Sequence, residues 1–309
     1  MSAPSSHRSL AHWWFLLPFL LLFTGFTLVP LLRSVPLSMS HAFGPEATVF
    51  VGLDKFEQAL NDPRFWRAVR NTLLFTLGSV FIQLPVSLGL ALALNRPDVR
   101  GRTVFKLLFF SPQLVGLVFV AVLASVAFQK QMGLVNVTLA EFVSRAQAIA
   151  GDGVLPPVLD VLALPWLETL AMPTLILTAL WMYAGFNMVY FLAALQNVSH
   201  DLIEASTIDG AGPVRRFISV ILPTIRPVTV FVVLLSILAS LQLFELPFIM
   251  LSEGTGIQDR GLTIVTYLFK SGFEAGDLGF ATAIGWLLAT LLATVAVAQR
   301  LLVTDGESS

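Results

Sequence analysis

The chain has 309 residues, of which 56% are apolar and only 12% charged, and its mean hydropathy is +0.83. Soluble domains carry about a quarter charged residues, so this composition excludes an ordinary soluble enzyme. A formal net charge of −1 and a pI near 6.4 argue against a nucleic-acid-binding surface, and the lack of cysteine excludes disulfides and thiolate metal sites.

Six long segments without a charged residue follow one another along the chain, and each is 18 to 32 residues long. A helix that crosses a bilayer needs roughly 20 apolar residues. Within lipid a helix satisfies its own backbone hydrogen bonds, so these segments are expected to be helical. The sequence therefore predicts an all-α integral membrane protein with six transmembrane helices in one bundle, at about residues 13–33, 71–95, 107–129, 173–195, 228–250 and 279–300.

The first apolar segment follows His7 and Arg8, as the apolar region of a signal peptide would. It is longer than the roughly 7 to 15 residues of such a region, and the segment from Arg33 to Pro36 offers no small-residue cleavage site. We therefore expect a short N-terminal segment, 1–12, followed by a retained helix.

The distribution of Lys and Arg indicates how the helices are oriented. If the N-terminus is cytoplasmic, six helices place the C-terminal tail, 303–309, there too, and nine basic residues fall on each side. Four of them crowd between the second and third helices, which favours a cytoplasmic loop there: Arg96, Arg100, Arg102 and Lys106. We expect both termini in the cytoplasm and the larger loops outside, at 34–70, 130–168 and 253–277.

The fourth and fifth helices carry polar and aromatic side chains. Tyr183, Asn187 and Tyr190 share one helical face because they are spaced i, i+4 and i+7, and Gln242 and Glu245 are spaced i, i+3. Aromatic rings can cover the C–H faces of a sugar ring, and amides can bond its hydroxyl groups. We interpret these five residues as candidates for a substrate path, although packing between helices explains each residue alone equally well.

The segment 196–227, between the fourth and fifth helices, is predicted to be a cytoplasmic helical hairpin. Asp201 can cap a first short helix that ends near Ile208. The pair Asp209-Gly210 supplies the turn after it, because glycine adopts backbone angles that other residues avoid.

A second helix of the hairpin is predicted to begin at Pro213, since proline suits a first helical turn, and to end at Pro223 and Pro227. Phe217 and Ile221 would share one face and be exposed to water unless something covered them. A partner protein could cover this face, or it could pack beneath the bundle or among lipid headgroups. Periodicity does not separate these possibilities.

One run of the hairpin reads Glu204-Ala205-Ser206-Thr207-Ile208-Asp209-Gly210-Ala211, and Phe217 and Leu222-Pro223 follow it. This run closely resembles the EAA loop of ABC-importer permeases, with a serine at the third position of the Glu-Ala-Ala pattern. Other segments resemble carbohydrate-uptake permeases of the maltose, glycerol-3-phosphate and multiple-sugar type, among them Asp62-Pro63, Phe65-Trp66, Asn71-Thr72 and Arg100-Gly101-Arg102. The likeness covers most of the chain and is weakest over 130–168.

This resemblance implies the type I ABC-importer permease architecture and a hairpin that contacts a cytosolic ATPase through Glu204, Ala205, Asp209, Gly210, Ala211, Phe217, Leu222 and Pro223. For Gly210, a purely conformational role in the turn is an equally good explanation. The resemblance also implies a second permease subunit of a different sequence, two ATP-binding subunits and an extracytoplasmic solute-binding protein. The substrate would be a sugar or sugar derivative, and the location a bacterial or archaeal plasma membrane with its lipids.

The chain itself is not expected to be an enzyme. It lacks the G-x-x-x-x-G-K-[ST] phosphate loop, so ATP would be hydrolysed by a partner subunit. Four scattered histidines offer no metal-ligand pair at helical spacing, and no cofactor is expected. The alternatives are an importer for amino acids or polyamines, a secondary transporter or channel relying on Glu245, and a membrane-embedded enzyme, for which no nucleophile and base stand out.

Overall fold

The computed structural model describes residues 11–43, 48–96, 98–150 and 156–304. Two compact units make up the chain: unit 1 combines Met1–Asn61 with Leu268–Leu287, and unit 2 combines Asp62–Tyr267 with Leu288–Ser309. The single transmembrane domain expected from about residue 13 to 302 stays a prediction.

The first transmembrane helix has an unusual amount of uncovered apolar surface. It runs from Trp14 to Ser38 with a mean hydropathy of 2.3, and none of its most apolar window is buried. Such a surface is stable only in lipid or against another protein. Most of the predicted terminal segments, 1–12 and 303–309, lies outside the described residues.

The described helices confirm the all-α membrane fold. Five are long and apolar enough to cross a membrane: Trp14–Ser38, Pro63–Leu94, Ala171–Leu195, Pro213–Leu241 and Leu278–Gln299. The remaining predicted span consists of α6 (Arg102–Val115) and α7 (Leu117–Ala127), which are bent by 98° relative to each other. Gly116 lies between them with a φ of +92°, a conformation open to glycine, so the bend has a local backbone cause.

Unit 1 contains two short paired strands and a buried ion pair. Strand β1 (Ser40–His41) pairs antiparallel with β2 (Val49–Phe50). Lys55 Nζ lies 2.7 Å from Asp277 Oδ2, and Asp277 Oδ1 accepts a hydrogen bond from the amide of Phe280, which fixes the start of the last helix. The helical elements of unit 1 are α1 (Ala11–Phe23), α2 (Val29–Ser38), α3 (Asp54–Asn61) and a π-helical turn at Lys270–Glu274; α15 (Ile264–Phe269) and α16 (Leu278–Thr304) begin in one unit and end in the other.

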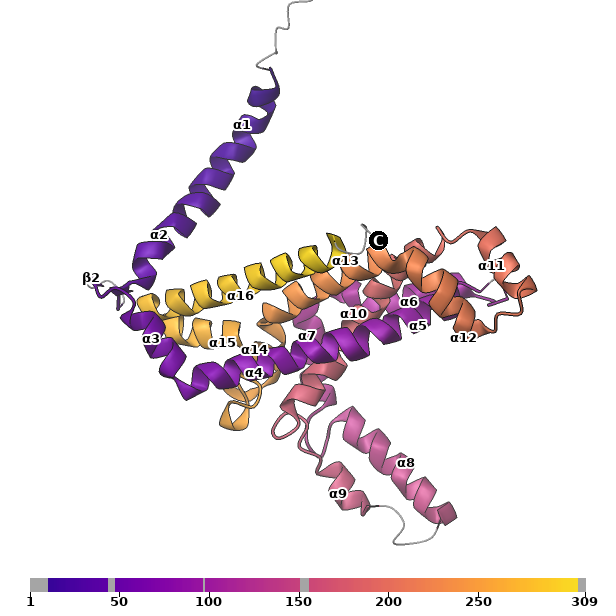
Figure 1. Ribbon diagram of the computed structural model, residues 1–309. Helices are drawn as coiled ribbons and strands as arrows, with labels where there is room; N and C mark the ends of the chain where they lie inside the picture. Colours follow the sequence, from indigo (N-terminus) through magenta and orange to yellow (C-terminus); the bar gives the residue numbers. More distant parts are fainter. Residues whose placement is uncertain (1–10, 44–47, 97, 151–155, 305–309) are drawn as a thin grey trace, which may run out of the picture. The chain divides into compact units, whose positions relative to one another are not determined.

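In unit 2, α10 (Ala171–Leu195) packs against α4 (Pro63–Gly78), α5 (Leu84–Leu94), α6 and α13 (Leu222–Leu241). Figure 1 shows α4 and α5 as successive parts of one long helix. Met188 and Phe191 of α10 are buried in a core that includes Leu84 and Ile225. The other helical elements of unit 2 are α8 (Leu134–Ala150), α9 (Val158–Leu162), α11 (His200–Ile208), α12 (Pro213–Arg216), α14 (Glu245–Met250) and the 3-10 turns Ser252–Gly254 and Ile257–Asp259.

Three of the long helices contain a π-helical turn that ends two residues before a proline. The prolines are Pro30, Pro85 and Pro223, and the turns are Thr24–Leu28, Ser79–Gln83 and Phe217–Ile221. Proline removes one helical hydrogen bond and crowds the carbonyl four residues earlier, and a locally wider turn relieves that conflict. The prediction that Pro223 and Pro227 end the hairpin's second helix is therefore wrong, because the helix continues from Pro213 to Leu241.

Candidate functional site

The predicted hairpin is present, with α11 and α12 at one end of the bundle in unit 2 (Figure 1). Helix α11 ends as expected at a glycine turn. The amide of Gly210 bonds the carbonyl of Thr207 at 3.1 Å and that of Ala211 bonds the carbonyl of Ser206 at 2.9 Å, while Gly210 has a φ of +75°. This pair of bonds satisfies the last carbonyls of the helix and needs a left-handed residue at Gly210.

The start of α11 differs from the prediction. Ser199, not Asp201, occupies the N-cap position, and its side chain makes no capping bond. Asp201 lies inside the first turn, where a negative charge interacts favourably with the helix dipole. A carboxylate in the first turn of a helix lies only one or two residues from the N-cap position, so the sequence does not distinguish the two. This explains why Asp201 was predicted as the cap.

The exposed apolar surface of the hairpin comes from other residues than expected. Phe217 is half-buried rather than exposed, and Ile221 packs against the core of unit 2. Four apolar side chains are exposed instead: Leu202 at 53%, Ile208 at 86%, Val214 at 70% and Ile218 at 58%. A cluster of this kind marks a surface that binds another protein or lipid.

The other predicted contact residues fall into two groups along the hairpin. Glu204, Ala205, Asp209 and Gly210 are exposed, and Ala211 is half-buried. At the far end of the hairpin, Leu222 is half-buried and Pro223 is exposed. Arg216 ties the second helix to the turn by donating from Nη2 to the carbonyl of Ala211 at 3.3 Å.

A cavity of about 260 Å³ lies within unit 2 between α4, the π-helical turn Ser79–Gln83, α10 and α13. Tyr183, Asn187 and Tyr190 all line it, so the predicted spacing does bring the three side chains to one space. The full lining is Phe75, Ser79, Gln83, Tyr183, Phe186, Asn187, Tyr190, Val232, Leu235, Ser236, Ala239, Ser240 and Leu243.

The cavity wall combines aromatic rings with a small polar cluster. Phe186 and Tyr190 meet edge to face with ring centroids 5.2 Å apart. The polar cluster includes Ser79 and Ser236, whose hydroxyl oxygens lie 2.7 Å apart and form a hydrogen bond. Asn187 is buried, and among the described residues its amide has no hydrogen-bond partner. Its donors and acceptor are therefore available to whatever occupies the cavity.

Gln242 and Glu245 do not form the predicted pair on one helix. Helix α13 ends at Leu241, and Gln242 donates back to the carbonyl of Leu238 at 3.0 Å, so it does not line the cavity. Glu245 begins the separate helix α14, whose first turn contains Pro247. Proline fits a first helical turn but not a helix interior, so a new helix begins here. Glu245, like Gln242, is absent from the cavity lining.

Sequence reasoning attributed Gln83 to helix packing and did not select Ser79 or Ser236, yet all three line the same cavity. Gln83 and Ser79 belong to the π-helical turn before Pro85, and such turns are frequent at functional sites. Pro85, two residues after Gln83, was the feature of the sequence that could have indicated this turn. Trp181, by contrast, is exposed and lines a different, apolar pocket.

Residues 83–304 match the family described as "Binding-protein-dependent transport system inner membrane component". The chain belongs to this family. Arabinooligosaccharides transport system permease protein AraP of Bacillus subtilis (strain 168) is 32% identical over 94% of this chain and 87% of its own length. Lactose transport system permease protein LacF of Rhizobium radiobacter is 31% identical over 93% of this chain and 92% of its own.

A solved structure has the same fold as this importer permease. It is a bacterial alginate ABC transporter in complex with an alginate pentasaccharide-bound periplasmic protein, and one of its chains matches with a TM-score of 0.76 and 22% identity, covering 94% of this chain and 93% of that chain. The identification of a carbohydrate-type ABC-importer permease is confirmed. As a member of this family the chain is a membrane transport subunit that works with a binding protein.

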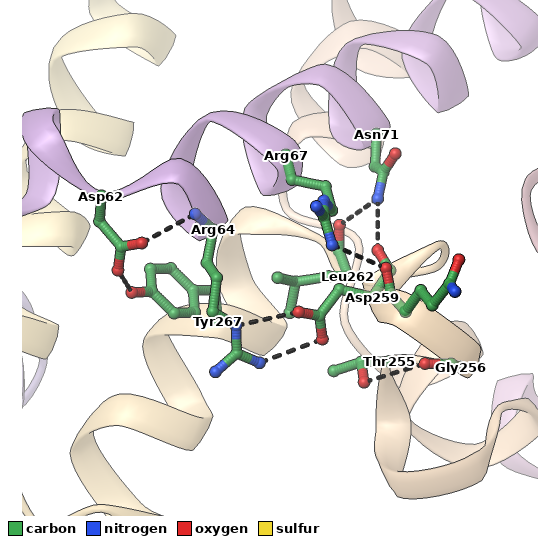
Figure 2. Close-up of polar contacts among 10 residues, drawn as sticks. Asp62, Arg64, Arg67, Asn71, Thr255, Gly256, Asp259, Leu262 and Tyr267 are labelled. Carbon is green, nitrogen blue, oxygen red and sulfur yellow. Dashed lines mark hydrogen bonds and ion pairs between the residues drawn. The ribbon is translucent and has the colours of Figure 1, made fainter.

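In this permease, the start of α4 holds the loop between α14 and α15 (Figure 2). Arg64 donates from Nε and Nη2 to the two carboxylate oxygens of Asp259, at 2.9 and 3.0 Å. The buried amide of Asn71 donates to the carbonyls of Asp259 and Leu262, both at 3.0 Å. We call these contacts, together with those of Asp62, the loop clamp.

The loop clamp holds backbone in an unfavourable conformation. Gln258 and Asp259 have φ angles of 57° and 56°, which cost side-chain-bearing residues about 1–2 kcal/mol each. Asp62 accepts bonds from the amide of Arg64 and the hydroxyl of Tyr267, and so fixes both the helix start and the end of the loop. The sequence offered no signal for this contact, since Arg64 and Asp259 are 195 residues apart.

Proposed function

We propose that this chain forms, with a second permease subunit of a different sequence, the pathway by which a sugar or sugar derivative crosses the membrane. The cavity in unit 2 carries the proposal. Tyr183, Asn187 and Tyr190 present rings and an amide to one space, and Gln83 adds a second amide. A sugar ring has apolar faces and a rim of hydroxyls, and this wall complements both. The names of the relatives, which refer to arabinooligosaccharides and lactose, support the same substrate class.

The hairpin formed by α11 and α12 is proposed to dock on a cytosolic ATP-binding subunit, of which two copies serve the two permeases. Its exposed Leu202, Ile208, Val214 and Ile218 provide the apolar contact, and Glu204 adds a carboxylate for a basic partner group. The hairpin and both termini then lie in the cytoplasm. An extracytoplasmic binding protein delivers the solute to the opposite face, in a bacterial plasma membrane.

The first experiment is to purify the tagged chain in mild detergent from its native membrane and to identify the proteins that accompany it. ATP hydrolysis is then measured with binding protein loaded with arabinose oligomers, lactose, an amino acid or a polyamine. We expect an ATPase and a second permease in the complex, and stimulation by a sugar only. Stimulation by the amino acid or polyamine would contradict the sugar assignment. A chain that purifies without an ATPase and transports solute driven by an ion gradient would contradict the whole proposal.

A further inference from the structure

A polar pocket of about 550 Å³ lies beside the loop clamp, between α4, the start of α10 and the loop after α14. Arg67 and Arg70 of α4 and Arg260 of the loop line it, and Met172 and Pro173 form part of its apolar side. The pocket lining contains no acidic residue. Three positive charges therefore face one space without a carboxylate among them.

The carboxylates near this pocket are engaged elsewhere. Asp259 receives the bidentate contact of Arg64, at 2.9 and 3.0 Å. Glu168 lies 3.7 Å from the ammonium group of Lys130. Each acid is thus paired with a base outside the pocket, so these two pairs add no net charge beside the three lining arginines.

Two of the lining arginines are held in place by neutral groups. Arg67 donates from Nη1 to the carbonyl of Gln258 at 2.9 Å, and Arg260 donates from Nη1 to the carbonyl of Thr169 at 3.2 Å. Each guanidinium keeps further N–H groups for another acceptor, because arginine carries five donors. These bonds orient the charges and leave them uncompensated, as a preformed anion site requires.

The pocket opens onto an exposed apolar stripe of the same helix. Leu74 and Leu77 follow Arg70 at i+4 and i+7, and so share its face of the regular helix α4. They are 41% and 51% exposed. A molecule whose anionic group binds the arginines would therefore find, next to them, an apolar surface suited to a hydrocarbon chain.

The length of the helix places the arginines at the depth of lipid phosphates. The 24 residues from Asn71 to Leu94 are helical and extend about 36 Å at 1.5 Å per residue. A hydrocarbon core is about 30 Å thick, and the headgroup layers bring the total to about 40–45 Å. With Leu94 at one boundary, Arg70 lies in the headgroup layer of the other.

We propose that Arg67, Arg70 and Arg260 bind the phosphate of an anionic phospholipid whose acyl chain lies along Leu74 and Leu77. Guanidinium groups pair with phosphate oxygens through two parallel hydrogen bonds, which a single ammonium group does not match. The charge, the apolar stripe and the depth all fit a lipid, whereas an acidic patch of a partner protein would use the charge alone. The site is independent of which solute the permease transports.

The test uses the complete transporter complex, equilibrated with equimolar phosphatidylglycerol and phosphatidylcholine, and native mass spectrometry to count the lipids it retains. We expect retention of phosphatidylglycerol over phosphatidylcholine. Each of Arg67→Gln, Arg70→Gln and Arg260→Gln should weaken phosphatidylglycerol binding about fivefold, because one basic residue near a membrane surface contributes about that factor. Arg145→Gln is the matched control, since Arg145 is an exposed arginine on α8 that does not line the pocket.

Three results would overturn the lipid assignment. The triple variant could retain as much phosphatidylglycerol as the wild type. The variants could leave lipid retention unchanged and weaken attachment of the binding protein, which would make the pocket a protein contact. Inorganic phosphate could displace the lipid as well as phosphatidylglycerol itself does, which would make it a site for free anions, because inorganic phosphate cannot use the apolar stripe.

Discussion

Ile208 is the hairpin residue whose exposure is hardest to explain without a partner. Its side chain is 86% exposed, so Ile208→Glu removes no packing within the chain and should leave folding intact. If an ATP-binding subunit covers this side chain, burying a glutamate there should cost several kcal/mol and remove that subunit from the complex. Ile149→Glu is the control, because Ile149 on α8 is 90% exposed and lies outside the hairpin. Equal recovery of ATPase with both variants would contradict the docking proposal.

Gly210 allows its two proposed roles to be separated. A Cβ added there would meet nothing within 4 Å, so a substitution acts only through the φ of +75°. Gly210→Val should cost about 1–2 kcal/mol or more and disturb the turn, while Gly210→Asn should be tolerated, since asparagine adopts this conformation. We expect substrate-stimulated ATP hydrolysis to fall with valine and persist with asparagine. Loss of stimulation with both would mean that the partner requires the bare backbone of glycine.

The loop clamp joins α4 to the loop between α14 and α15 through a buried amide and an exposed ion pair. These two contacts should contribute unequally to stability. Asn71→Ala leaves the carbonyls of Asp259 and Leu262 without their donor in a buried place, at a cost of about 1–3 kcal/mol. Arg64→Gln breaks an ion pair whose arginine is 51% exposed, which is worth about 0–1 kcal/mol. We therefore expect the larger loss of thermal stability in detergent from Asn71→Ala. The reverse order would show that the ion pair, rather than the buried amide, holds the loop.

The whole molecule shows which features a sequence pattern can predict. Tyr183 and Asn187 reach one cavity because a regular helix preserves their spacing, and Gly210 was predictable because its turn depends on local backbone geometry alone. Gln83 was not predictable by spacing, since the π-helical turn shifts the face on which it lies. Asp259 was missed because its partner is distant in sequence, and no local pattern encodes such a contact.

Helix α10 leads from the cavity to the hairpin, because it carries Asn187 and ends at Leu195, shortly before α11 begins. Transport in the reconstituted complex should therefore separate their roles through the number of solute molecules moved per ATP. If Asn187 bonds the solute as proposed, Asn187→Ala removes one hydrogen bond worth about 0.5–1.5 kcal/mol, and it should lower uptake while stimulated ATP hydrolysis continues. Gly210→Val should lower uptake and hydrolysis together if the hairpin couples the permease to the ATP-binding subunit, as proposed.

The ratio of uptake to hydrolysis thus falls in the first variant and is constant in the second. Val189→Ala is the control for the cavity variant, because Val189 is 45% exposed on the same helix and does not line the cavity. An unchanged ratio with Asn187→Ala would assign Asn187 to packing between helices, and the solute would then have to pass along other side chains. A ratio that falls with Gly210→Val would mean that the turn shapes the pathway itself and does not only transmit the energy of ATP hydrolysis.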